Sequence, residues 1–234
     1  MRPDRTALLL AAAFLASTLL GCSREPSPWD RVPAQHTKVD HSTFFEVASF
    51  EDGPSVTRAC LRCHEQEAHD FMQTSHWTWK GDVVERHGEE IAIGKANLIN
   101  NFCIGIQSNE PRCTSCHAGY GWGFDGFDFT DAEKIDCLIC HDTSGAYQKD
   151  DAGAGMPAAG VDLLEAAKSV GPPTRQNCGY CHFRGGGGDA VKHGDLDGTM
   201  YFPSERIDVH MGRYDFACTA CHQAERHEIP GRSM

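Results

Sequence analysis

The pentapeptide CTSCH occupies residues 113–117, and four further strings of the same form occur in the chain. They are CLRCH (60–64), CLICH (137–141), CGYCH (178–182) and CTACH (218–222). Each holds two cysteines separated by two residues, with a histidine directly after the second cysteine. This is the attachment pattern of c-type haem. Two thiols one helical turn apart can bond the two vinyl groups of one porphyrin, and the next residue then lies under the iron as its proximal ligand.

Two other uses of paired cysteines explain the pattern less well. A zinc site needs two such pairs for each metal ion and has no use for a histidine after every pair. A disulfide framework suits an exported chain, but it leaves the five histidines unexplained. We therefore predict five covalently attached haems c. The predicted attachment residues are Cys60, Cys63, His64, Cys113, Cys116, His117, Cys137, Cys140, His141, Cys178, Cys181, His182, Cys218, Cys221 and His222.

Each of the five irons needs a second axial ligand if the haems serve electron transfer, and histidine is the usual choice in multihaem proteins. Eight histidines lie outside the five motifs. We predict that the distal ligands come from five of them: His41, His76, His193, His210 and His227. Trp77 and Trp79, which flank His76 in "SHWTWKG", are either porphyrin-stacking or ordinary core aromatics. The pairing of distal ligands with motifs stays open at this point.

Aliphatic side chains are too scarce to fill an ordinary core. Leu, Ile, Val and Phe make up 36 of the 213 residues after Gly21, about 17%, a fraction typical of disordered chains. Five porphyrins would supply the missing apolar material. We expect a mainly α, loop-rich fold with little β, in which the polypeptide wraps around a haem chain. Helices are predicted over residues 57–77 and 161–170, and from a capping box at residues 130–133. The motifs are unequally spaced, which excludes a regular solenoid.

The N-terminus has the features of an export signal. A short basic start precedes the apolar run TALLLAAAFLASTLL, and Leu19-Leu20-Gly21-Cys22 resembles the bacterial lipoprotein cleavage box. We predict a signal peptide over residues 1–21, a lipidated tether over 22–40 and a pentahaem cytochrome c domain over 41–234. Lipid on Cys22 would then anchor the chain on the periplasmic side. Ser23, rather than aspartate, favours the outer membrane.

Longer stretches resemble one family. They include "EDGPSVTRACLRCH", "GKANLINNFC", "SNEPRCTSCHAGYGW", "FDFTDAEKIDCLICHDT" and "SVGPPTRQNCGYCHFRGGGGDAVKHGDLD". Over roughly residues 38–231 the chain is similar to octahaem c-type cytochromes of the tetrathionate reductase family. The family pattern continues for about three more haems, whereas this chain stops after the fifth motif. Three explanations are open: the gene product is truncated, a partner supplies the missing haems, or a shorter protein serves another purpose.

The resemblance implies a distinct second haem. In that family the second haem keeps its C-x-x-C-H motif but takes lysine as the other axial ligand, and it is the presumed active site. The matching lysine here is Lys192, opposite His117, with Lys80 and Lys95 as rival ligands. Glycines 185–188 would let the backbone approach the porphyrin closely. The resemblance also places Cys103 near this haem, where a thiolate could attack or hold a sulfur substrate; the alternative is an inert buried thiol. Asp189 is a candidate for transferring a proton or holding Lys192, and the alternative is a solvated carboxylate.

Two functions follow as expectations. The first is a reductase in which electrons reach the lysine-ligated haem and reduce a small sulfur or nitrogen compound, tetrathionate being favoured. The second is a non-catalytic electron-transfer lipoprotein in which all haems are six-coordinate. A formal charge of −12 opposes a dianionic substrate at long range, so the pocket would need local positive charge from Arg112, Arg184 and the iron. The expected partners are redox proteins, among them a further multihaem cytochrome; no nucleic acid is expected.

Overall fold

The computed structural model of the protein describes residues 39–97, 105–183, 188–189 and 196–231. Backbone contacts divide the chain into Met1–Thr37 and Lys38–Met234, and every described residue belongs to the second unit. The predicted signal peptide and the site of lipid attachment at Cys22 lie outside the described residues. So do the predicted ligands Lys192 and His193, and Cys103. None of the described helices is long and apolar enough to cross a bilayer.

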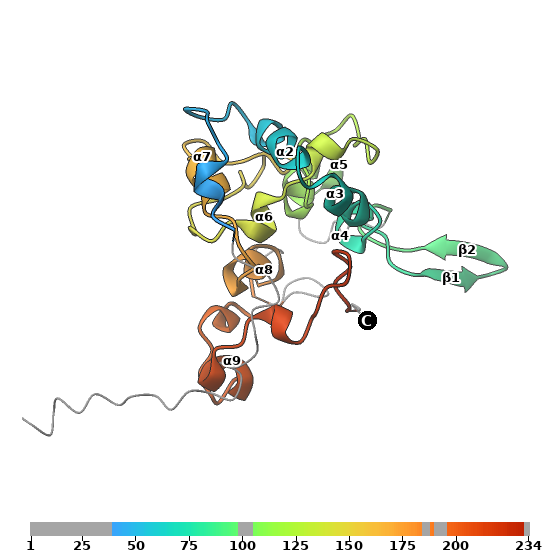
Figure 1. The fold of residues 1–234 in the computed structure, drawn as a ribbon. Coiled ribbons are helices and arrows are strands. Elements are labelled where there is room, and N and C mark those ends of the chain that lie inside the picture. The colour runs from blue at the N-terminus through green and yellow to red at the C-terminus, as the bar shows by residue number, and fades with distance from the viewer. Residues whose placement is uncertain (1–38, 98–104, 184–187, 190–195, 232–234) are drawn as a thin grey trace, which may run out of the picture. The chain divides into compact units, whose positions relative to one another are not determined.

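The described part of the chain consists of short helices joined by long irregular segments (Figure 1). The α-helices are α2 (Gly53–Leu61), α3 (Glu65–Phe71), α4 (Ser75–Thr78), α5 (Ile106–Cys113), α6 (Leu138–His141), α7 (Leu163–Lys168), α8 (Arg175–His182) and α9 (Val209–Tyr214). Single 3-10 turns are η2 (His41–Thr43), η3 (Thr114–Cys116), η4 (Ala132–Lys134), η5 (Gly198–Tyr201) and η6 (Cys218–Ala220). The prediction of a mainly α, loop-rich fold is confirmed.

The helix predicted over residues 57–77 is wrong in its extent, because three short helices replace it. Helix α2 begins earlier, at Gly53, where the Asp52 carboxylate accepts from the Ser55 backbone N–H at 2.8 Å and the Ser55 hydroxyl accepts from the Asp52 N–H at 3.1 Å. This reciprocal pair caps the first turn. Helix α4 ends at Trp79, whose left-handed backbone (φ +52°) cannot continue a helix.

The capping box predicted at residues 130–133 is also wrong. Asp131, not Thr130, caps the turn, because its carboxylate accepts from the Glu133 backbone N–H at 3.0 Å. The Thr130 hydroxyl instead donates to Asp128 at 2.7 Å. The resulting element is the 3-10 turn η4, and the third motif has its own helix, α6. The helix predicted at 161–170 is confirmed as α7, which Asp162 caps.

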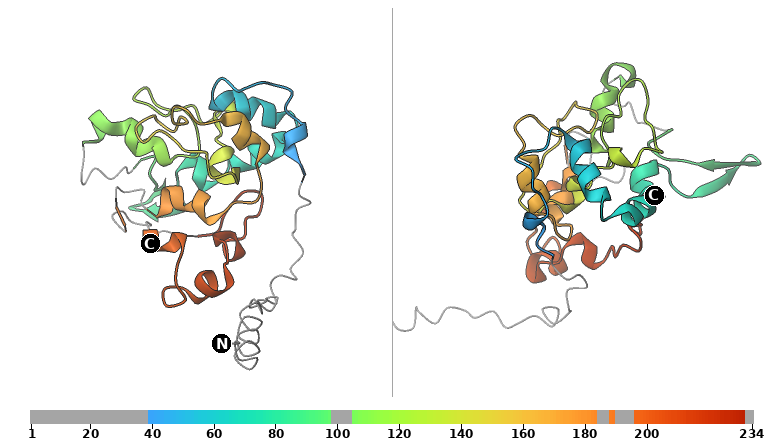
Figure 2. Two further views of the ribbon diagram at one scale, coloured as in Figure 1. Left: turned by 90° about the vertical axis from the view of Figure 1, so that its left-hand side faces the viewer. Right: turned by 45° about the horizontal axis from the view of Figure 1, so that its top comes forward.

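A two-stranded antiparallel hairpin was not predicted. Strands β1 (Val83–Arg86) and β2 (Glu89–Ala92) pair with Val83 opposite Ala92 and Arg86 opposite Glu89. The hairpin stands away from the helices in Figure 1 and in the right-hand view of Figure 2. All four β1 side chains are exposed, so neither face is buried and no alternation of apolar and polar residues marks the strands.

Two small clusters form the apolar core. In the first, Val56 of α2 packs with Leu138 and Ile139 of α6 and with Leu163 and Ala166 of α7. In the second, Trp77 packs with Ala68 and Ile135. The Thr57 hydroxyl joins the two by donating to the Ile135 carbonyl at 2.6 Å. The core therefore holds the helices that carry the first and third motifs side by side.

Candidate haem-binding centres

The five motifs occupy the ends of short helices or 3-10 turns. Cys60 lies in the last turn of α2, and His64 is the N-cap of α3. The second motif runs from the end of α5 through η3, the third is α6, the fourth ends α8, and the fifth begins η6. One helical turn brings two cysteines three positions apart to the same face, as attachment to one porphyrin requires.

Three motif histidines each lie opposite a histidine from outside the motifs. The ring centroids of His41 and His64 are 6.3 Å apart, with the ring planes at 28°. Those of His76 and His182 are 6.2 Å apart, and those of His141 and His227 are 6.3 Å apart. The structure thus brings together three of the five predicted distal histidines with a motif histidine each.

The spacing of these three pairs fits one metal atom between two imidazoles. A metal–imidazole bond is about 2.0–2.1 Å long. The ring centre lies somewhat over 1 Å beyond the bonding nitrogen, so two rings that share a metal have centres about 6.3 Å apart. Rings in direct van der Waals contact can lie closer, as the 4.7 Å between His117 and Phe127 shows. The residues of the first, third and fourth motifs therefore fit a bis-histidine haem.

Hydrogen bonds at Nδ1 orient several of these rings. Nδ1 of His41 lies 3.0 Å from the Val39 carbonyl, and Nδ1 of His141 lies 2.9 Å from the Gly171 carbonyl. In the fifth motif, Nδ1 of His222 lies 2.8 Å from the Pro230 carbonyl. A carbonyl partner at Nδ1 places the ring proton there and makes Nε2 the nitrogen that a metal would take.

The second motif is built differently. His117 is completely buried, and its neighbouring rings are the aromatic residues Trp77, Trp79, Trp122, Phe127 and Phe129, with centroids 4.7–6.0 Å away. Burial lowers the pKa of His117 to about 4, and the positive charge of Lys149 acts in the same direction. The imidazole is therefore neutral at pH 7, the form that binds metals.

The nitrogens of His117 do not have the arrangement of the other motifs. Nε2 lies 2.7 Å from the Trp77 carbonyl, and Nδ1 is buried without a hydrogen-bond partner. Ligation through Nε2 would require that the bond to Trp77 be given up, so the second motif as arranged does not fit the bis-histidine pattern. The expected partner, Lys192, lies outside the described residues.

The remaining predicted residues are placed as follows. The ring of His210 lies 6.0 Å from that of Phe216, and no described ring contact joins it to a motif histidine. The Asp189 carboxylate accepts from the Gly198 backbone N–H at 2.8 Å. Of the rival lysines, Lys80 is exposed and the ammonium of Lys95 lies 5.4 Å from the Trp79 ring centroid.

Thiol contacts link different motifs. The side chains of Cys60 and Cys137, of Cys116 and Cys181, and of Cys178 and Cys218 are neighbours, and the Cys181 thiol donates to the Cys116 carbonyl at 3.6 Å. The Asn177 amide also donates to the Ile139 and Asp142 carbonyls, at 3.1 and 3.0 Å, and so ties the fourth motif to the third. The fourth motif therefore touches the second, the third and the fifth, and the third also touches the first.

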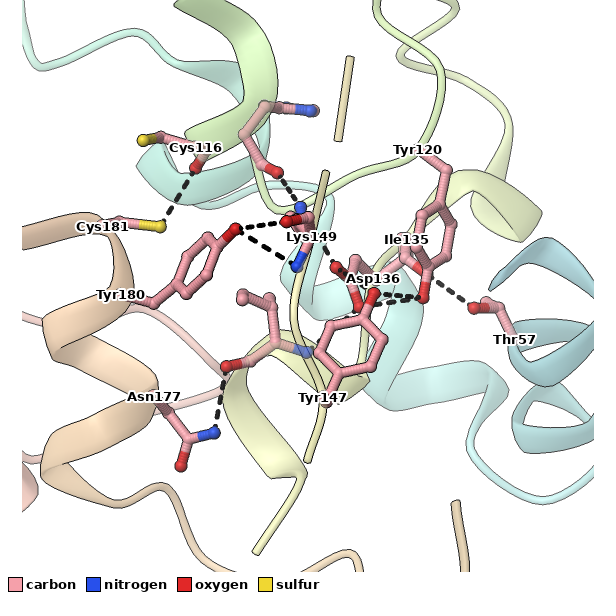
Figure 3. Close-up of polar contacts among 12 residues, drawn as sticks. Thr57, Cys116, Tyr120, Ile135, Asp136, Tyr147, Lys149, Asn177, Tyr180 and Cys181 are labelled. Carbon is pink, nitrogen blue, oxygen red and sulfur yellow. Dashed lines mark hydrogen bonds and ion pairs between the residues drawn. The ribbon is translucent and has the colours of Figure 1, made fainter. Parts of the chain in front are cut away.

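One buried polar cluster was missed by the analysis of the sequence. Lys149 and Asp136 form an ion pair with tyrosines 120, 147 and 180 around it (Figure 3). The available signals were slight: Asp136 directly precedes a motif cysteine and Tyr180 lies inside CGYCH. Lys149 itself stands in no motif.

No protein-family model and no curated protein matches the chain. Among solved structures, it is similar to the octaheme cytochrome c from Shewanella oneidensis, with 50% sequence identity and a TM-score of 0.73. The match covers 83% of this chain and 43% of the other, so this chain spans less than half the length of that protein. The fold is that of a multihaem cytochrome c, mainly helical and rich in loops.

Proposed function

We propose that this chain, which has the fold of a multihaem cytochrome c, binds one haem c at each of its five motifs and carries electrons along them. The observation that supports this best is the set of three histidine pairs with ring centroids 6.2–6.3 Å apart. Bound haem supplies the one-electron Fe(III)/Fe(II) chemistry. The residues of the chain attach the porphyrin, ligate the iron and exclude water from part of the chain of haems.

The pairs also assign distal ligands. His41 would serve the first motif, His227 the third and His76 the fourth. Burial and the neighbouring His182 lower the pKa of His76, which keeps that ring neutral and able to ligate. We propose Lys192 for the second motif, and His193 or His210 for the fifth.

The contacts between motifs outline an electron path. It runs from the first motif through Cys60 and Cys137 to the third, and from there through the Asn177 contacts to the fourth. From the fourth it branches through Cys181 and Cys116 to the second, and through Cys178 and Cys218 to the fifth. The fourth motif is the junction of this path.

A test of the ligand assignment compares His227→Ala with His69→Ala. His69 lies on α3 and its side chain is 73% exposed, so it serves as a control. With five haems covalently bound by mass spectrometry, His227→Ala should convert one haem from low-spin to high-spin in its electron paramagnetic resonance spectrum. His69→Ala should change none. An unaltered spectrum for His227→Ala would remove this residue from the ligand set.

A reductase activity at the second motif is the second candidate. The observation that favours it is the environment of His117. This histidine is enclosed by aromatic side chains, and no histidine in the described part of the chain lies opposite it. We propose a small oxidised sulfur or nitrogen compound as substrate. Tetrathionate would take two electrons from the haem chain, break its central S–S bond and leave as two thiosulfate ions. Cys103 and Asp189 are the proposed assisting residues, and Arg112 would contribute positive charge.

Ligand binding and tetrathionate turnover distinguish the reductase from a protein that only carries electrons. In the reductase, the reduced protein binds a small ligand such as carbon monoxide at one haem only. Lys192→Ala then abolishes tetrathionate turnover while five haems stay attached. Five uniform bis-histidine spectra, with no ligand adduct and no turnover, would leave the carrier function alone. We further propose export, lipid attachment at Cys22 and an outer-membrane location, which the features of the first 40 residues support. We propose redox proteins as partners, because a formal charge of −12 suits docking to a basic redox protein.

A further inference from the structure

A fully buried ion pair stands where three of the five motifs meet. The Nζ of Lys149 lies 3.1 Å from Oδ2 of Asp136, and both side chains have no exposed surface. Burying two charges is costly, and well-packed neutral residues are often as stable or more stable. A pair retained in such a place calls for a reason beyond stability alone.

The pair touches each of the three motifs by a different route (Figure 3). The Lys149 ammonium donates to the backbone carbonyl of His117 in the second motif. Asp136 directly precedes Cys137 of the third motif. Within the fourth motif, the Tyr180 hydroxyl accepts from the Lys149 backbone N–H at 3.1 Å and donates to its carbonyl at 2.9 Å.

The Asp136 carboxylate is satisfied without the lysine. It accepts from the Tyr120 hydroxyl at 2.8 Å, from the Ile139 backbone N–H at 3.1 Å and from the Tyr147 hydroxyl at 2.9 Å. Burial raises the pKa of both tyrosines well above the usual value, so both remain donors. Since neutral donors already hold the carboxylate, hydrogen bonding to Asp136 is not what requires a charge at residue 149.

A fixed charge acts on a redox centre in a way that a neutral hydrogen bond does not. Reduction of a haem iron adds one electron and breaks no bond. A positive charge nearby therefore stabilises the reduced form, and a negative charge stabilises the oxidised form. At this site the positive end of the pair points at the second motif and the negative end lies at the start of the third.

We infer that Lys149 and Asp136 are positioning residues whose opposite charges set the reduction potentials of the haems around them, above all at the second motif. This rests on the proposed haem attachment. The lysine lies nearer the second motif and raises the potential of the second haem, whereas the aspartate lies nearer the third motif and mainly lowers the potential of the third haem. Electrons that reach the fourth motif are thereby directed toward the second.

The test is a potentiometric titration of the haem-loaded protein, with each haem followed by its own electron paramagnetic resonance signal. Lys149→Met should lower the midpoint potential of the second haem, and Asp136→Asn should raise it. The double variant should return most of the way to the original value. A purely structural role does not produce shifts of opposite sign that cancel.

A matched control is the ion pair of Arg58 and Glu133. It has the same 3.1 Å distance, but both side chains are 49% exposed. Arg58→Met and Glu133→Gln should shift the potential of any haem by less, because water and salt screen charges that are half exposed. Equal shifts at the two pairs would overturn the inference.

The outcomes separate this inference from the proposed function. Mass spectrometry of the original protein decides haem attachment: fewer than five haems contradicts the proposed function itself. If five haems are attached but Lys149→Met and Asp136→Asn shift the midpoint potential in the same direction, or not at all, the inference alone is contradicted. If Lys149→Met fails to fold, Asp136→Asn and the double variant decide. In Asp136→Asn the Lys149 ammonium keeps the His117 carbonyl as acceptor, and the single amide oxygen of asparagine can accept from one of the two tyrosines. The double variant leaves neither charge buried without its partner.

Discussion

The second and fifth motifs have opposite surroundings. His117 has no exposed surface and is enclosed by five aromatic rings. His222 is exposed and follows a single 3-10 turn, with one hydrogen bond to Pro230. One protein thus offers the same five-residue motif a closed and an open environment.

The difference has a physical consequence for the two haems. In the closed environment, water does not screen nearby charges, so Lys149 and Asp136 would act strongly on a haem iron bound at the second motif. In the open environment, screening is strong, but another protein can approach the porphyrin. The second motif is therefore suited to chemistry and control of potential, and the fifth to exchange of electrons with a partner.

The largest expected effect comes from opening the closed environment. Trp77→Ala removes a fully buried indole whose N–H donates to the Phe129 carbonyl at 2.9 Å. Loss of so large a core side chain should cost about 3–5 kcal/mol. Tyr214→Ala, at a 36% exposed residue near the fifth motif, should cost under about 1 kcal/mol. Denaturant unfolding of both variants measures this, and similar costs would show that the two regions are equally packed.

Crowding beside the second motif can be tested with two glycines of equal backbone conformation. Gly155 and Gly160 both have φ +86°. A Cβ at Gly155 would lie 2.2 Å from the Gly119 carbonyl oxygen, whereas none of the surrounding atoms lies within 4 Å of a Cβ at Gly160. Gly155→Ala should cost about 3 kcal/mol through strain and overpacking, and Gly160→Ala only the 1–2 kcal/mol, roughly, of a left-handed backbone. Thermal unfolding distinguishes them.

Two capping carboxylates extend the comparison to acid pH. The buried Asp142 accepts from Ser144, Gly145, Tyr147 and Ser169. Burial opposes its charge, but these bonds outweigh burial and lower the pKa of Asp142 below 3.8. Its contribution to stability is therefore complete above about pH 4 and is lost as the pH falls through the lowered pKa.

Asp142→Asn should accordingly cost about 1–3 kcal/mol at pH 7, and the cost should vanish in strong acid. The matched variant is Asp197→Asn, at the exposed cap of η5, where hydrogen bonds from Thr199 lower the pKa of the carboxyl. Its loss of stability at pH 7 should be smaller. The free energy of unfolding of both variants, measured between about pH 2 and pH 7, tests this. A cost of Asp142→Asn that does not change with pH would contradict the lowered pKa of Asp142.

The smallest effect is expected for the ion pair that ties the fifth motif region to α8. Arg175 pairs with Asp215, whose side chain is 74% exposed. Asp215→Asn should reduce stability by about 0–1 kcal/mol, and added salt should erase the difference. Unfolding at low and high ionic strength checks this. A larger, salt-independent cost would mean that the fifth motif is held as firmly as the second.

Part of the structure could be predicted from local sequence alone. The attachment motifs are local patterns, and three of the predicted distal histidines (His41, His76 and His227) do lie opposite motif histidines. Which histidine meets which motif could not be predicted, because the partners are 23, 106 and 86 residues apart along the chain, by subtraction of their numbers. The hairpin was missed because strands that bury no face carry no alternating pattern.

The amino-acid sequence by itself predicted five motifs for haem attachment, and it determined that the chain would be helical, short of aliphatic residues and rich in loops. Spacing within one helical turn is a local property, so no fold is needed to read it. Only the tertiary structure decided that His117 is enclosed, that the fourth motif is the junction, and that Lys149 and Asp136 meet between three motifs. These depend on contacts between distant segments, which packing selects and which no single stretch of sequence encodes.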